Sequence, residues 1–143
     1  MSTLSRDPTF LPLTVSAATM AINNAAPQHR AGATTVRQRA AEVDQAAAEC
    51  WAGLLAGCDT MTAKALPGRL RALSDATSRY AGAGWWFSDG CKHRERVDSA
   101  LARIEDAIDE RDGAEFAEAF IGYDLAVATA VAKVHARSET PAR

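Results

Sequence analysis

The chain has 143 residues, enough for one domain that buries most of its apolar surface without a metal or a disulfide. Its formal net charge of −2 excludes a general electrostatic attraction to nucleic acid or to an anionic membrane. The 32 alanines favour helices over strands, and 13 arginines against 3 lysines suggest a GC-rich bacterium or its phage as the source. We therefore expect an all-α protein, a four-helix up-down bundle with an N-terminal arm.

Cysteine usage and the N-terminal sequence indicate the compartment. Cys50, Cys58 and Cys91 are odd in number and irregularly spaced, which fits reduced cytoplasmic thiols better than a disulfide framework. The first residues lack the uninterrupted apolar core of a signal peptide, and no run approaches the ~18 apolar residues of a membrane span. We expect a cytoplasmic protein. No nucleotide-binding glycine motif is present, so we also expect no cofactor.

Residues 1–34 are predicted to form the arm, which is partly extended. Pro8, Pro12 and Pro27 interrupt it, and the stretch 16–26 has the composition of a short helix with Ser16 as its cap. The arm is too apolar for a freely solvated tail. We expect it to lie across the bundle or across a partner subunit.

The bundle itself is predicted over residues 35–136 and is followed by a frayed tail at 137–143. A capping box at Thr35 predicts the start of its first helix, and Gly57 predicts its end. Pro67 should kink or divide the second helix. The short turn Asp112-Gly113 makes the third and fourth helices an antiparallel hairpin, with Asp112 as a cap. The four predicted helices are 35–57, 60–82, 89–111 and 114–136.

Asp124 interrupts the most apolar of these helices, near the middle of its apolar arc. A buried carboxylate costs several kcal/mol unless it is paired, so Asp124 must find a donor, take up a proton or face a cavity. The third helix offers no cation at the same height. Asp124 is therefore a structural residue held by the arm or by the first two helices, or a ligand-facing or catalytic acid. If its face of the helix is misjudged, it is an exposed residue.

A second cluster is expected where the third helix begins. In the antiparallel hairpin, Cys91 and His93 lie within about one helical turn of His135. Thiolate and imidazole are ligands that Zn²⁺ prefers, with Cys50 or Cys58 as a further donor. Cys-x-His is not a standard zinc spacing, however, so an ordinary helix end with a small buried thiol is the alternative.

Two features indicate protein–protein contacts. Trp85, Trp86 and Phe87 either plug the end of the bundle or protrude as binding anchors. The predicted helix 89–111 is basic at its N-terminal end and acidic at its C-terminal end, which is the reverse of what the helix dipole favours. Such a charge distribution is complementary to that of an antiparallel copy of the same helix. Its basic residues are Lys92, Arg94 and Arg96, and its acidic residues are Glu105, Asp106, Asp109 and Glu110.

The tripeptide Trp51-Ala52-Gly53 resembles the W-x-G motif in the helical-hairpin substrates of type VII secretion, over residues 35–84. The resemblance implies a secreted helical hairpin. Three features differ from that family. The tripeptide lies inside an apolar periodic run and not at a clear turn, Tyr80 is followed four residues later by Gly84 instead of an acid, and a second helical hairpin follows.

Together these patterns predict a small non-enzymatic interaction or assembly module, for example a regulatory one. Its partner would be another protein or a second copy, bound through the 89–111 helix and the arm, and its binding residues would be Trp85, Trp86, Phe87, Arg94 and Asp124. The alternative is a small-molecule-binding or metal-binding bundle, an enzyme included, centred on Asp124 or on Cys91, His93 and His135. We expect neither nucleic acid nor a membrane as a partner.

Overall fold

All regular structure in residues 9–57 and 61–139, the parts of the chain that the computed structural model describes, is helical. Five helices are long and two are single turns. This confirms the all-α prediction and gives a packed helical arrangement. The elements are α1 (Pro12–Asn24), α2 (Pro27–Ala56), α3 (Met61–Lys64), α4 (Leu66–Ala81), α5 (Ala83–Trp86), α6 (Cys91–Asp109) and α7 (Gly113–Glu139).

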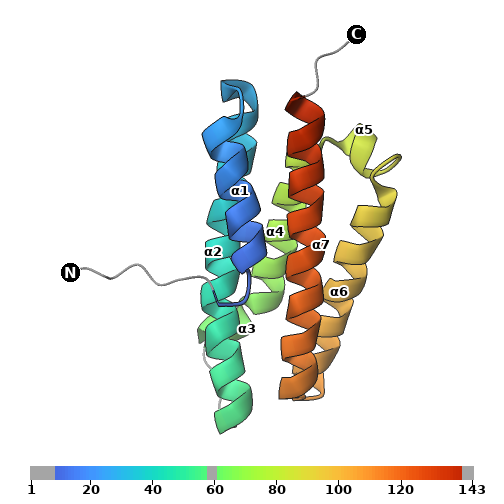
Figure 1. Cartoon of the computed structure of the whole chain (residues 1–143). Coiled ribbons are helices and arrows are strands. Elements are labelled where there is room, and N and C mark those ends of the chain that lie inside the picture. The colour runs from blue at the N-terminus through green and yellow to red at the C-terminus, as the bar shows by residue number, and fades with distance from the viewer. Residues whose placement is uncertain (1–8, 58–60, 140–143) are drawn as a thin grey trace, which may run out of the picture.

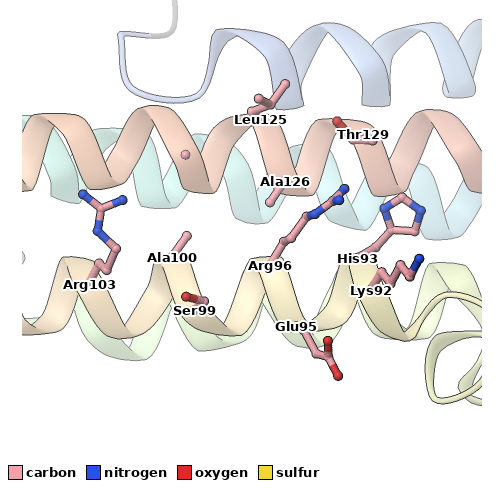
Figure 2. A pocket seen from close by; sticks show the side chains of 11 residues that line it. Lys92, His93, Glu95, Arg96, Ser99, Ala100, Arg103, Leu125, Ala126 and Thr129 are labelled. Carbon is pink, nitrogen blue, oxygen red and sulfur yellow. The ribbon is translucent and has the colours of Figure 1, made fainter.

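The long helices form two layers (Figure 1). The front layer contains α1, α7 and α6, with α7 in the middle, and α2 and α4 lie behind it (Figures 1 and 2). Helix α7 runs antiparallel to α6 and in the same direction as α1 (Figure 1). The central position of α7 explains why its sequence is apolar around so much of its circumference.

The N-terminal arm is more helical than predicted, and the predicted start of the next helix at Thr35 was wrong. Helix α1 begins at Pro12, four residues before the predicted cap at Ser16, and packs on α2 and α7 of its own chain. Helix α2 begins at Pro27 instead of Thr35, because proline fits the first turn of a helix. Thr35 is an interior residue whose hydroxyl donates to the Ala31 carbonyl oxygen at 3.1 Å. Residues 1–8 of the predicted arm lie outside the described residues.

The other predicted boundaries are closer to the structure. Gly57 ends α2 in the left-handed conformation, with φ of 76°. The second predicted helix is divided at Ala65, and Pro67 lies in the first turn of α4, where its missing N–H costs little. Asp112 caps α7 as predicted, since its Oδ1 accepts the Glu115 N–H at 3.0 Å. Helix α7 extends to Glu139, so residues 137–139 are helical and not frayed.

Aromatic side chains join the start of the chain to α2 and α7. The Phe10 ring lies 5.2 Å from that of Phe120 and 5.8 Å from that of Phe116, centroid to centroid. Trp51 of α2 completes this group, 6.4 Å from Phe10. Such edge-to-face pairs add to the apolar burial and fix where the chain enters α1.

Candidate functional site

Asp124 caps α1 from a neighbouring helix. The residue is only 3% exposed, and its carboxylate accepts the backbone N–H of Leu13 at 3.1 Å and that of Thr14 at 2.8 Å. The Thr14 hydroxyl donates in return to the Asp124 carbonyl oxygen at 3.2 Å. These N–H groups belong to the first turn of α1, whose own N-cap position holds Leu11 and makes no side-chain cap. Asp124 thus finds its donors in the backbone of the arm.

Asp44 of α2 accepts the backbone N–H groups of the residues just before α1. This residue was not identified from the sequence. One carboxylate oxygen of Asp44 accepts the N–H groups of Thr9, Phe10 and Leu11 at 3.0, 2.6 and 3.2 Å. Because Pro12 has no N–H, the two carboxylates accept every backbone N–H from residue 9 to residue 14. Asp44 lies beside the apolar seam of α2, and nothing in the local sequence indicates its distant partners.

The three aromatic residues of the connector differ in burial. Trp86 is buried in the core and plugs the end of the bundle. Trp85 is half-buried, stacked on the His93 ring at 5.7 Å, with the Arg137 guanidinium 4.8 Å from its centroid. Phe87 is exposed.

Arg94 is engaged within its own chain. Its guanidinium lies 5.0 Å from the centre of the Phe87 ring and 3.6 Å from the Asp98 carboxylate. Its Nε is buried and has no hydrogen-bond partner. The predicted binding role of Arg94 would require these contacts to be given up, so other cations of α6 are better placed.

The cysteine and histidine residues that the structure describes do not assemble as a metal centre. In the described ranges, no group of three or more His, Cys, Asp or Glu side chains is placed to hold a metal ion. The set Cys91, His93 and His135 therefore does not form such a group. Burial lowers the pKa of His93, and the nearby positive charges of Arg96 and Lys133 lower it further. Cys58 lies outside the described residues.

The open groove on the front layer lies between α6 and α7 and has a volume of about 630 Å³ (Figure 2). Small residues line much of it, and Arg96 and Arg103 of α6 extend toward α7 (Figure 2). Glu95 also belongs to the lining, but its carboxylate points away from α7 (Figure 2). Arg103 is paired with Glu115 at 2.8 Å. Lys92 and Arg96 make no ion pair with any carboxylate of the described residues. The basic residues Lys92 and Arg96 were identified from the sequence, but the groove was not predicted.

Large apolar side chains are exposed on this same layer. Ile121 and Leu125, one turn apart on α7, are 69% and 55% exposed. Leu13 of α1, whose N–H binds Asp124, is 49% exposed. The front layer therefore presents an apolar strip along α7 beside a groove lined by Lys92 and Arg96, which have no ion pair within the described part of the chain.

The W-x-G tripeptide lies inside a helix and not at a turn. Both Trp51 and Gly53 belong to α2, which continues to Ala56. Comparisons with family models, with curated proteins and with solved structures found no match to this chain. None of the helices in residues 9–57 and 61–139 is both long enough and apolar enough to cross a membrane.

Proposed function

We propose that this protein is a small non-enzymatic interaction module that binds another protein chain through the front layer of α1, α7 and α6. The observation that carries the proposal is the exposure of Leu13, Ile121 and Leu125 at 49–69% on two neighbouring helices. Apolar anchors of this size, bordered by charged side chains, are typical of protein–protein contact surfaces.

The sites on which an enzymatic interpretation would be centred have other contacts. Asp124 is occupied by two N–H groups of α1, and His93 stacks on Trp85 beside two cations. The lining of the groove suits a helix of a partner protein. Its small residues Gly122 and Ala126 allow a second helix to approach closely, and its cations provide a charged border. These features favour a protein partner over a small substrate.

A photo-activated cross-linking amino acid at position 125 tests the proposal in cells of the source organism. We expect irradiation to join Leu125 to a specific protein chain, identified by mass spectrometry. The matched control places the same amino acid at Arg79, an exposed residue of α4 in the rear layer. If position 125 yields no protein adduct beyond that obtained at position 79, the front layer is not an interaction surface and the proposal is wrong.

A further inference from the structure

One stripe along α6 is basic at its beginning and acidic at its end. Its members follow one another at spacings of four and three residues, so they share one face of the helix and its C-cap. Ser99 and Arg103 in this stripe also line the groove, which places the stripe beside α7. All six residues are exposed: Lys92, Arg96, Ser99, Arg103, Asp106 and Glu110.

Helix α7 repeats this charge separation in the same direction across the molecule. Lys133, near its end, lies close enough to His93 to lower the pKa of that imidazole, as Arg96 of α6 does. Glu118, near the other end of α7, is exposed. Since α6 and α7 are antiparallel, Lys92, Arg96 and Lys133 lie at one end of the face, and Asp106, Glu110 and Glu118 lie at the other. Leu125 lies between these ends and lines the groove.

We propose that the partner of this face is a second copy of the chain, packed antiparallel about a two-fold axis that crosses α6 midway between Ser99 and Arg103 and crosses α7 near Leu125. The inference rests on the proposed function and names its partner. Rotation about this axis places the basic end of one copy on the acidic end of the other. Arg96 then lies opposite Asp106 of the second copy, and Leu125 packs near its own counterpart.

Charge complementarity favours a second copy over a partner of one charge. A uniformly acidic partner would meet Lys92 and Arg96 but would be repelled by Asp106 and Glu110, and a basic partner would face the reverse problem. A two-fold arrangement satisfies both ends with one kind of contact, repeated twice. Ser99 and Gly122, at the centre, are small enough to let the helices approach.

The size of the face sets the expected affinity. Helix α6 has 19 residues and is therefore about 28 Å long, and two helices about 10 Å wide present on the order of 600 Å² per copy. This is below the ~800 Å² per partner of a standard stable interface. Exposed ion pairs add little and are screened by salt. We therefore expect a dimer with a dissociation constant in the micromolar range that weakens as salt is added.

Sedimentation equilibrium of the full chain provides the test, with the charge reversals Arg96→Glu and Asp106→Arg. Each variant alone would place two like-charged pairs in its homodimer, so we expect its dimer to dissociate at least about tenfold more readily than that of the natural chain. In an equimolar mixture of the two variants, every pair is again of opposite charge, and we expect the affinity to return.

The control is Arg79→Glu, the same charge change on the exposed rear layer, which should leave dimerisation unchanged. A natural chain that is monomeric at all accessible concentrations overturns the inference, as does a mixture that stays as weak as its components. These failures differ from a failure of the proposed function. A monomer that still cross-links through Leu125 to a different protein keeps the interaction module and removes only the second copy.

Discussion

Replacing Asp124 by asparagine should lower the free energy of unfolding by about 2–4 kcal/mol. The two carboxylate oxygens accept the N–H groups of Leu13 and Thr14, and an asparagine side chain keeps only one accepting oxygen. One buried N–H would then face an NH₂ group, at a cost of about 1–3 kcal/mol. Loss of the negative charge at the N-terminus of α1 removes up to about 2 kcal/mol more.

Thermal unfolding followed by circular dichroism measures this loss. For a chain of this length, about 3 °C of melting temperature corresponds to 1 kcal/mol, so we expect a decrease of about 6–12 °C. Asp112→Asn is the matched control, because Asp112 makes an exposed cap where asparagine is nearly as good as aspartate. Hydrogen exchange should show faster exchange in α1 before α6 is affected.

Two results would refute this reasoning. One is an Asp124→Asn protein within about 0.5 kcal/mol of the Asp112→Asn protein, since the buried N–H groups would then have lost nothing. The other is loss of exchange protection that begins in α6, because Asp124 would then stabilise the hairpin instead of α1.

Two further predictions concern Tyr123, which contacts α4 from α7, and Gly90, which lies against Trp85 of the aromatic connector. Tyr123→Phe should cost about 1–2 kcal/mol at neutral pH, because the buried phenol donates to the Leu70 carbonyl oxygen at 3.1 Å. Burial raises the pKa of Tyr123, so the unfolded chain loses this proton first, and stability should fall as the pH rises above about 10. Urea unfolding across that range should show a smaller loss in Tyr123→Phe, and an equal loss in both proteins would contradict the assignment. Gly90→Ala should destabilise the chain by about 1–3 kcal/mol, since a Cβ there would lie 2.7 Å from the Trp85 ring. Tryptophan fluorescence and thermal unfolding check this, and an unchanged spectrum with unchanged stability would show that Trp85 is not packed against Gly90.

Much of the bundle could be predicted because its signals are local. The helical period, the glycine at position 57 and the cap at Asp112 each act over a few residues. The start of α2 was missed because Thr35 resembles a cap in sequence, although its hydroxyl binds a carbonyl one turn earlier. A threonine can do either, so the residues around Thr35 do not by themselves show whether the helix begins there.

The candidate site could be predicted only in part, because its contacts join distant residues. The sequence indicates that Asp124 needs a donor, but the donor is 110 residues away along the chain and belongs to the backbone of α1. Backbone groups have no signature in a sequence. Asp44 also binds distant backbone N–H groups, but its position in the sequence does not indicate that it needs donors. A half-buried acid beside an apolar seam resembles an ordinary surface residue in sequence.

These two carboxylates also determine what the front layer presents. Asp44 of α2 and Asp124 of α7 accept all the N–H groups around the start of α1, so a shift of α1 by one turn would leave buried donors without acceptors. The position of α1 along α7 is therefore fixed, and with it the height at which Leu13 is exposed. If Leu13 forms part of the dimer surface, Asp124→Asn should weaken both folding and self-association. Arg96→Glu should weaken self-association alone, because its exposed side chain makes no ion pair within the described residues of its own chain. Measuring both quantities for both variants separates the stabilising role of Asp124 from the recognition role proposed for α6.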